Sequence, residues 1–357
     1  MSSIEALGWT EFFQRQIHDE ERAQARIARV VAEYRGAWRL AGEFDGLAEI
    51  SGRLRHDAVT PAARPAVGDW VLATAGDRDD RAIIRRVLDR RSTLSRAAAG
   101  TATEQQIVAA NVDTIFIVTS FNEDLSANRL DRYLTMVWQS GAVPVVVINK
   151  MDLSSDAASV ADAMRTRLPF VDVHAVSALA DGGVDVLSPY LEPARTIAFV
   201  GSSGVGKSSL INRIVGGNAL RVSEIREADG KGRHTTTARQ LVALPSGALV
   251  IDTPGMRELQ PWSADAGLAA AFDDVALLAA SCRFADCSHV TEPDCAVLQA
   301  VSDGRLDLER LESFRRLEAD AAFEARKHDK AAAANAKRRW KQASKAQKAM
   351  FRDRGQR

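Results

Sequence analysis

The sequence predicts three folded parts in a row: a small β-barrel, an α/β domain built on a parallel sheet, and a small helical module that contains all the cysteines. Short alternating apolar runs separated by Gly, Pro and Asp turns between residues 35 and 97 indicate the barrel. Near-continuous apolar strands alternating with amphipathic helices between residues 105 and 258 indicate a sheet covered on both faces. The remaining chain is helical in pattern and ends in an Ala, Lys and Arg rich tail.

Length and composition fit a multidomain protein without a membrane segment. The chain has 357 residues, which is too long for one ordinary core. Its apolar runs, such as residues 114–118 and 144–148, are far shorter than the roughly 20 residues that cross a bilayer, and the start MSSIEALGWTEFF lacks a signal pattern. Three cysteines cannot pair into a disulfide framework. We expect a cytoplasmic monomer.

The net charge of zero hides an asymmetry along the chain. Residues 326–357 contain 12 Lys and Arg against two Asp, a balance of +10, so the preceding 325 residues carry 35 basic and 45 acidic side chains. A basic tail therefore follows an acidic body. With Trp340 and Phe351 among the positive charges, the tail suits RNA phosphates and stacked bases, and a solvated basic helix is the alternative.

The first 98 residues are expected to form two parts. Residues 1–34 have helix-compatible spacing and mixed charge, so we expect a helical extension. Residues 35–98 fit a five-stranded barrel of the oligonucleotide-binding (OB) type, which takes about 60 residues. On this pattern alone, a β-domain that serves only for packing fits equally well.

The α/β domain is expected over residues 99–258. Its predicted strands cover residues 114–120, 143–150, 171–179, 195–201 and 247–255, and its predicted helices cover 130–141 and 158–168. Ligands in such folds bind at the carboxyl ends of the strands.

A phosphate-binding loop follows one of these strands. GSSGVGKS at residues 201–208 matches G-x-x-x-x-G-K-[ST], with the strand TIAFV before it and a helical pattern after it. Its glycines allow backbone N–H groups to surround an anion, Lys207 is placed to reach the β- and γ-phosphates, and Ser208 is placed to ligate Mg²⁺. A chance glycine turn with a surface lysine would not have both flanks.

A second phosphate motif, IDTPG, closes the strand at residues 251–255. We expect Asp252 to stabilise Mg²⁺ as a carboxylate outside the direct ligands of the ion, and the Gly255 N–H to contact the γ-phosphate. Alone, DTPG would be a turn; 45 residues after Lys207, it is the expected partner of a P-loop.

The base is predicted to be guanine. NKMD at residues 149–152 follows an apolar strand, and the Asp152 carboxylate can accept from both the ring N–H and the amino group of guanine, donors that adenine lacks at that edge. The alternative is a strand that ends in an Asx turn. SAL at residues 177–179 strengthens the guanine reading, because the Ala178 N–H can meet the guanine carbonyl.

These motifs occur in an inverted order. The base motifs precede the P-loop, whereas a P-loop protein usually has the reverse. Because the ends of such a domain lie near each other at the surface, joining them and opening the chain elsewhere leaves the site intact. The order therefore predicts a circularly permuted GTPase domain.

Catalysis is expected to depend on the segment GRHTTT at residues 232–237. Met256 stands where Ras-like enzymes have a water-orienting Gln, and a thioether cannot orient water. His234 is the candidate to position water, and Thr235 or Thr236 is placed to complete the Mg²⁺ shell. An exposed loop histidine beside turn-favouring threonines is the alternative.

Four residues have metal-ligand spacing. Cys282, Cys287, His289 and Cys295 form C-x4-C-x-H-x5-C, which suits one tetrahedral Zn²⁺. Four protein ligands leave no open position, so the zinc would be structural. Three small buried hydrophobes with a loop histidine are the alternative.

The motif order, the preceding β-domain and the following cysteine cluster together resemble the RsgA (YjeQ) family of GTPases that depend on the small ribosomal subunit. The likeness covers residues 35 to about 325. It implies an OB domain over residues 35–98, a permuted GTPase domain over 99–258, a zinc domain over 259–325, and a role late in small-subunit maturation. It also implies that His234 is catalytic. The spacing of one residue between Cys287 and His289 matches the spacing in that family.

The expected partners are GTP and GDP, the small ribosomal subunit with its rRNA, and other assembly factors. The rival readings are a signalling or transport GTPase that acts on a protein partner, and a P-loop ATPase with an accidental NKMD. The residues expected to contact the nucleotide are Asn149, Lys150, Met151, Asp152, Ser177, Ala178, Gly201, Ser202, Ser203, Gly204, Val205, Gly206, Lys207, Ser208, Ser209 and Gly255.

Overall fold

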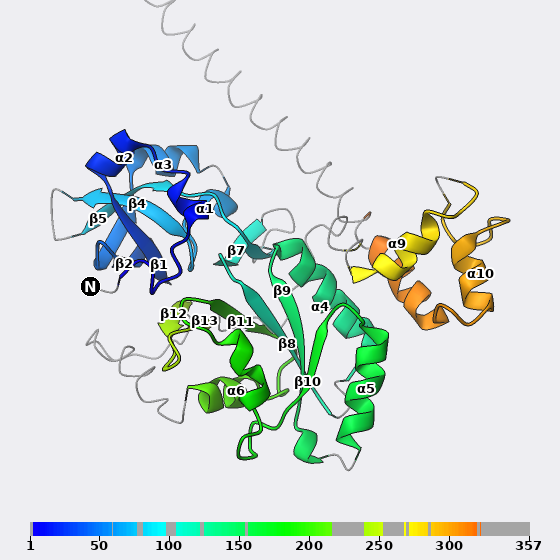
Figure 1. Ribbon diagram of the computed structural model, residues 1–357. Helices are drawn as coiled ribbons and strands as arrows, with labels where there is room; N and C mark the ends of the chain where they lie inside the picture. Colours follow the sequence, from blue (N-terminus) through cyan, green and yellow to red (C-terminus); the bar gives the residue numbers. More distant parts are fainter. Residues whose placement is uncertain are drawn as a thin grey trace, which may run out of the picture.

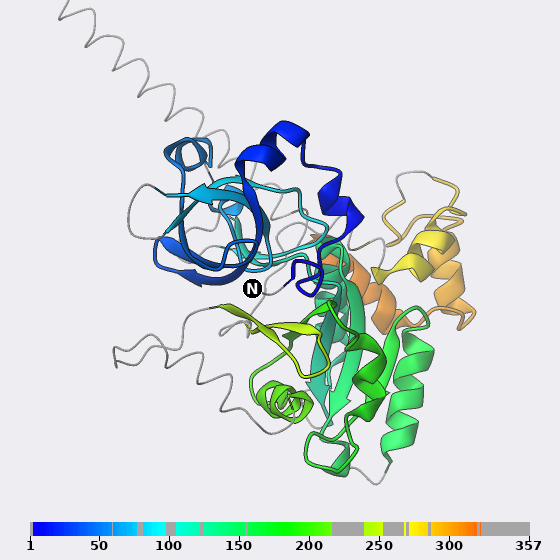
Figure 2. The same cartoon turned by 60° about the vertical axis from the view of Figure 1, so that its left-hand side comes forward.

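A computed structural model shows a β-barrel, an α/β domain and a small helical module (Figure 1), and the strands of the barrel and of the α/β domain are joined in one 11-stranded sheet. The structure describes residues 3–58, 60–76, 81–97, 105–121, 125–153, 156–215, 239–252, 268, 271–284, 287–319 and 322. The α/β domain lies between the barrel and the module, and both views agree on this arrangement (Figures 1 and 2).

The barrel has five strands, as the sequence predicted. They are β1 (Arg26–Tyr34), β2 (Ala37–Gly42), β3 (Gly46–Ile50), β4 (Trp70–Ala75) and β5 (Ala82–Val87). Their order is β1-β2-β3-β5-β4, and a further antiparallel pairing of β1 with β4 closes the ring. Buried apolar side chains fill the interior, among them Val30, Leu40 and Ile84. Between β3 and β4 lie the short helices α3 (Gly52–Asp57) and η1 (Pro61–Ala63).

The structure corrects the expectation of a helix throughout residues 1–34. Only α1 (Glu11–Gln14) and α2 (Asp19–Gln24) are α-helical there, and β1 already begins at Arg26. The helix expected for residues 26–34 was wrong because this strand is buried on both sides. Ile27 belongs to one apolar cluster and Ala28 to another, which removes the alternation that marks a half-exposed strand.

A hairpin connects the barrel to the α/β domain. β6 (Thr93–Ala97) pairs antiparallel with β7 (Gln105–Ala110) as a separate two-stranded sheet. Residues 93–97, expected within the barrel, therefore pair with the segment that leads into the α/β domain.

The α/β domain is built on six strands whose spatial order differs from their order in the chain. They are β8 (Thr114–Ser120), β9 (Val143–Asn149), β10 (Asp172–Ala175), β11 (Thr196–Val200), β12 (Gln240–Ala243) and β13 (Leu249–Asp252). They run β10-β9-β8-β11-β13-β12 across the sheet, with β12 antiparallel to β13 and the other pairs parallel. β11 thus lies in the interior, between a strand that precedes it in the chain and one that follows it.

Helices cover both faces of this sheet, as the apolar strands predicted (Figure 1). Along β8, Ile115 and Ile117 pack in a cluster with Leu130 and Leu134 of α4 (Ala127–Ser140), whereas Phe116 and Val118 pack in a cluster with Leu210 of α6 (Lys207–Ile214). α5 (Ala157–Arg167) also covers the α4 face, through Met164. The alternation of β8 between two buried faces explains its continuous apolar sequence.

A buried arginine fastens the barrel to the α/β domain. Arg29 of β1 is 1% exposed, and its guanidinium donates to the carbonyls of Leu7, Gly68 and Asn111 and to Thr196 Oγ1 of β11. Burial lowers its pKa to about 10, so the group stays charged at neutral pH. One side chain therefore joins the N-terminal segment, the barrel and the strand that precedes the P-loop.

The helical module follows β13 in the chain. Its described elements are α9 (Asp273–Ala279), α10 (Ala296–Ser302) and a helical segment over residues 308–319. Within the described ranges, every helix is too short or too polar to cross a lipid bilayer.

Candidate functional site

The P-loop follows β11 and opens α6, as its motif predicted. Gly201 has φ +142°, and a Cβ there would lie 2.1 Å from the carbonyl oxygen of Val118 on β8. Gly206 has φ +92°, and a Cβ there would lie 2.3 Å from Asn149 Nδ2. A larger residue fits at neither position, so these glycines let the loop pass closely over two neighbouring strand ends.

The P-loop lysine lies along the loop backbone. Lys207 Nζ donates to the carbonyl oxygens of Gly201 at 2.7 Å and Ser202 at 2.5 Å. The ammonium therefore lies within the loop, at the first turn of α6. Positive charge at a helix N-terminus favours an anion in this position.

The base motif touches the P-loop directly. Asn149, at the end of β9, donates from Nδ2 to the carbonyl of Val205 at 2.9 Å. Lys150 has φ +62° and donates from Nζ to the carbonyl of Gly204 at 2.6 Å. Segments more than 50 residues apart therefore form one surface, despite their inverted order in the chain.

The SAL segment completes this cluster. The Ala178 N–H donates to Asn149 Oδ1 at 3.2 Å, and Ser177 Oγ donates to Asp152 Oδ1 at 2.5 Å. Asn149 thus links the P-loop to residues 177–179, while Ser177 orients the exposed carboxylate of Asp152. Met151 is 8% exposed, and its side chain packs in the core. Ser203, Ser208 and Ser209 are exposed around the loop.

Several predicted residues lie outside the described residues. These are His234, Thr235, Thr236, Gly255 and Met256, together with Trp340, Phe351 and the rest of the basic tail. Only the backbone of Asp252 is described. Gln240 of β12 pairs opposite Asp252 of β13. The segment that carries His234 therefore rejoins the described chain beside the end of the DTPG strand.

The four metal-ligand candidates come together in the helical module. One ligand atom from each of Cys282, Cys287, His289 and Cys295 lies within 4.8 Å of the others. Cys282 Sγ is 3.8 Å from Cys295 Sγ, and His289 Nδ1 lies 3.6 and 3.4 Å from these two sulfurs. The cysteines are free, and a tetrahedral metal with bonds of about 2.3 Å separates its sulfur ligands by nearly the observed distance. The cluster fits a closed tetrahedral metal site.

A carboxylate shapes the loop that presents His289. Glu292 accepts from the backbone N–H groups of Ser288, Val290 and Thr291, and from Ser288 Oγ. These bonds hold the pKa of Glu292 well below its usual range. His289 itself has φ +57°, so the capped loop maintains a backbone conformation that is uncommon for histidine.

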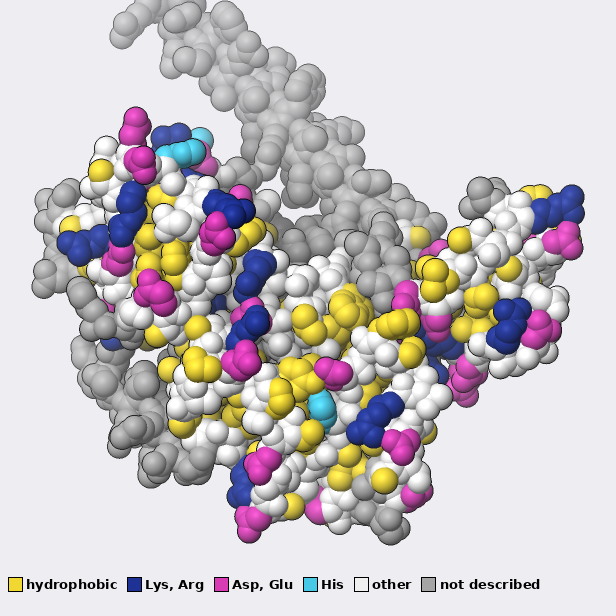
Figure 3. Space-filling view, in the orientation of Figure 1, with side chains coloured by type: hydrophobic (Ala, Val, Ile, Leu, Met, Phe, Trp, Pro, Cys, Tyr) yellow, Lys and Arg dark blue, Asp and Glu magenta, His cyan; other side chains and the backbone are white. Residues whose placement is uncertain are grey.

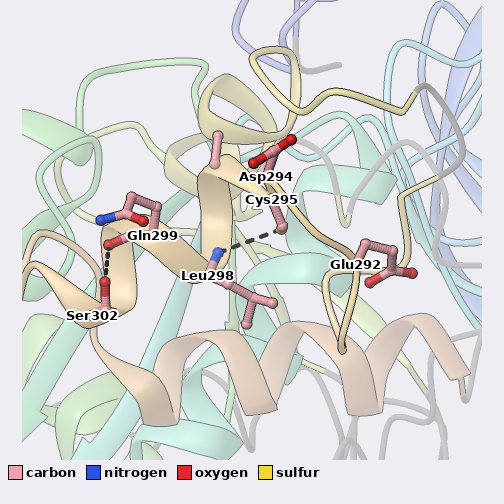
Figure 4. A pocket seen from close by; sticks show the side chains of 7 residues that line it. Glu292, Asp294, Cys295, Leu298, Gln299 and Ser302 are labelled. Carbon is pink, nitrogen blue, oxygen red and sulfur yellow. Dashed lines mark hydrogen bonds between the residues drawn. The ribbon is translucent and has the colours of Figure 1, made fainter.

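A groove of about 420 Å³ runs beside the metal cluster along α10 (Figure 4). Its lining includes Glu292 and Asp294, and none of the described residues that line it is a Lys or an Arg. Figure 4 shows both carboxylates at one end of the groove and Gln299 and Ser302 at the other. An acidic groove of this kind repels phosphate, so it does not compete with the P-loop as a nucleotide site.

Some contacts at the site were not predicted from the sequence. Arg129 of α4 donates to Ser202 Oγ of the P-loop at 3.0 Å, and no local pattern links residues 73 positions apart. The role of Glu292 in this loop could have been predicted from the sequence, because Glu292 lies between two predicted ligands, His289 and Cys295.

Comparisons with known proteins agree with this architecture. A model of the RsgA GTPase family matches residues 87–262. The chain is 42% identical to "Small ribosomal subunit biogenesis GTPase RsgA" of Opitutus terrae over 99% of both chains, and 47% identical to the protein of that name from Methanosarcina acetivorans over 78% of this chain and 75% of that one.

Solved structures give the same result. The crystal structure of YjeQ from Thermotoga maritima matches with a TM-score of 0.63 and 27% identity, covering 84% of this chain and 99% of that one. The crystal structure of YloQ, described as a circularly permuted GTPase, matches with a TM-score of 0.58 and 26% identity, covering 86% and 98%. The 42% identity to the Opitutus terrae protein over 99% of both chains, together with the permuted strand order and the Cys₃His cluster, shows that the chain belongs to the RsgA family of circularly permuted GTPases.

Proposed function

We propose that the protein binds GTP and GDP at the cluster formed by the P-loop, residues 149–152 and residues 177–179. The observation that carries this proposal is the bridge made by Asn149, which donates to Val205 of the P-loop and accepts from Ala178. The bridge brings phosphate-binding and base-reading segments into one surface. The exposed Asp152 carboxylate, oriented by Ser177, would then accept two hydrogen bonds from guanine.

Mg²⁺ would bind with the nucleotide. Ser208 is exposed at the start of α6, where its hydroxyl can ligate the ion beside the phosphates. Asp252 and one of Thr235 and Thr236 would complete the site. The metal supplies charge neutralisation of the phosphates, and Lys207 adds a cation from the loop.

Hydrolysis would use His234 to position the attacking water. Met256 cannot do so, because a thioether donates no hydrogen bond and accepts one only weakly. The pairing of Gln240 with Asp252 supports this role, because the described chain resumes within six residues of His234 and pairs with the strand that leads into DTPG. The turnover of the protein alone would therefore be slow and would rise when a partner fixes this segment.

The partner we propose is the small ribosomal subunit, at a late step of its maturation and with release of other assembly factors. The names of the relatives from Opitutus terrae and Methanosarcina acetivorans refer to biogenesis of this subunit. Basic and acidic side chains are interspersed on the face shown in Figure 3. The tail of residues 326–357, whose charge is +10, would supply positive charge for contact with rRNA. The protein would act as a cytoplasmic monomer, and one structural Zn²⁺ would occupy the Cys₃His cluster.

Two measurements test this function. Competition between GTP and ATP for the purified protein should show a strong preference for GTP, and equal competition would indicate an ATPase. Purified small subunits should then accelerate GTP hydrolysis, and the protein should co-sediment with them more strongly with a non-hydrolysable GTP analogue than with GDP. GTP-specific binding without any effect of the subunit would favour a GTPase that acts on a protein partner.

A further inference from the structure

The first turn of α4 contacts the P-loop. Arg129 Nη1 donates to Ser202 Oγ at 3.0 Å, and the carbonyl of the same Ser202 accepts from Lys207 Nζ at 2.5 Å. Arg129 therefore contacts the residue whose backbone holds the P-loop lysine. Its guanidinium also places a permanent positive charge beside the loop.

The N-terminal end of α4 is also fixed to the helical module. Asp131 is fully buried, and its Oδ1 accepts from Arg310 Nη1 at 2.9 Å, while its Oδ2 accepts from Arg167 Nη2 of α5 at 3.0 Å. Arg310 lies on the helical segment of residues 308–319 and is 5% exposed. One carboxylate of the α/β domain thus connects to both α5 and the helical module, which is called the metal module below because it contains the Cys₃His cluster.

Arg310 is held firmly inside its own module. Its Nε donates to Asp274 Oδ2 at 3.0 Å, Nη2 donates to the carbonyl of Ala271, and the guanidinium lies 4.1 Å from the ring centroid of Phe272. Contacts on this many sides fix the guanidinium to the body of the module. A displacement of the module would therefore act on Asp131 through a rigid group.

The two contacts of the turn face in different directions. Residues two positions apart on a helix lie on nearly opposite sides, so Arg129 can face the P-loop while Asp131 faces Arg310. If Arg310 moved away, the buried Asp131 carboxylate would keep only Arg167, and the buried Arg310 would keep only its partners within the module, so this ion pair tends to be either formed or fully rearranged. The turn is short and helical, and a shift at one contact moves the other.

We propose that the N-terminal end of α4, residues 127–131, couples the helical module to the nucleotide phosphates. Arg129 is a positioning residue that acts through Ser202 and Lys207, and the Asp131–Arg310 pair sets where Arg129 lies. This inference rests on the nucleotide site proposed above. Occupancy of the γ-phosphate position would shift the module, and a partner that moves the module would change the preference of the P-loop between GTP and GDP.

A double-mutant cycle on the full-length protein tests the coupling. The affinities of a fluorescent non-hydrolysable GTP analogue and of fluorescent GDP are measured for wild type, Arg129→Gln, Arg310→Gln and the double variant. Each single change is expected to lower the ratio of GTP-analogue to GDP affinity by about tenfold, with a coupling factor of about fivefold between them. Arg132→Gln removes an exposed charge from the same turn and should leave the ratio unchanged, whereas Arg129→Lys should restore it in part.

Independent effects of the two changes, with a coupling factor near one, would overturn the inference. If wild type binds neither nucleotide, the proposed nucleotide site fails and the inference fails with it, which is a distinct result. Hydrogen exchange on wild type needs no variant to fold. Replacing GDP by the GTP analogue should change the protection of residues 127–131 and 308–319 together, and a change confined to the P-loop would also refute the coupling.

Discussion

Replacing Gly206 by alanine should separate the base motif from the P-loop. The new Cβ would lie 2.3 Å from Asn149 Nδ2, so the Asn149 amide must move away from Val205 and Ala178. The loss of two hydrogen bonds of about 1 kcal/mol each adds to a cost of about 1–2 kcal/mol for alanine at φ +92°. The free protein can relax by moving Asn149, but nucleotide binding needs both segments in place, so the cost should appear in the affinity.

Gly204 provides the matched control for this change. Its φ is +85°, but a Cβ there meets no atom of the described residues within 4 Å, so Gly204→Ala adds the backbone strain without the clash. The difference between the two variants should therefore be about 2 kcal/mol, or about 30-fold in the dissociation constant of GDP. Titration of a fluorescent GDP measures both.

A double variant identifies the atom responsible. In an Asn149→Ala background the clash is absent, so the additional effect of Gly206→Ala should shrink to that of Gly204→Ala alone. If Gly206→Ala and Gly204→Ala weaken GDP by the same factor in the wild-type background, contact with Asn149 does not explain the glycine, and the reasoning is refuted.

Three further predictions concern other parts of the molecule. His234→Ala should lower subunit-stimulated GTP turnover by about tenfold or more with GTP affinity nearly unchanged; equal stimulated rates would remove His234 from the mechanism. Cys287→Ala should abolish binding of one Zn²⁺ per chain, measured by metal analysis, together with cooperative unfolding of residues 259–325; retained zinc would exclude the Cys₃His site. Arg29→Met should lower the free energy of unfolding by about 3 kcal/mol in a denaturant titration, because four acceptors lose their donor, whereas Arg39→Met on the exposed side of β2 should change it little.

Sequence patterns predicted those sites whose geometry depends on residues close together in the chain. The P-loop needs glycines at fixed positions next to Lys207, and the Cys₃His cluster lies within 14 residues, so both could be read from a short segment. The order of the motifs also predicted the permuted sheet, because each motif marks a strand end. β1 was misread because both of its faces are buried, one against each apolar cluster.

Contacts between distant segments had no such signal. The pair Asp131–Arg310 joins residues 179 positions apart, and an Asp in a helix with an Arg in another reads as two exposed charges. Only the fold shows that both are buried. The same holds for Arg29, whose acceptors are three backbone carbonyls and a threonine hydroxyl rather than a carboxylate.

The permuted order explains how the barrel and the metal module, the two parts attached to the α/β domain, are both joined to the nucleotide site. β11 carries the P-loop and is flanked in the sheet by β8 and β13. The barrel leads through the β6–β7 hairpin into β8, and the metal module follows β13, so each attached part is joined to an immediate neighbour of the P-loop strand. Gly201 already approaches the carbonyl of Val118 on β8, which leaves little room for the loop to move alone. Without the permutation, the chain would begin at the P-loop strand and end at β10, on the edge of the sheet, so neither terminal attachment would join β8 or β13.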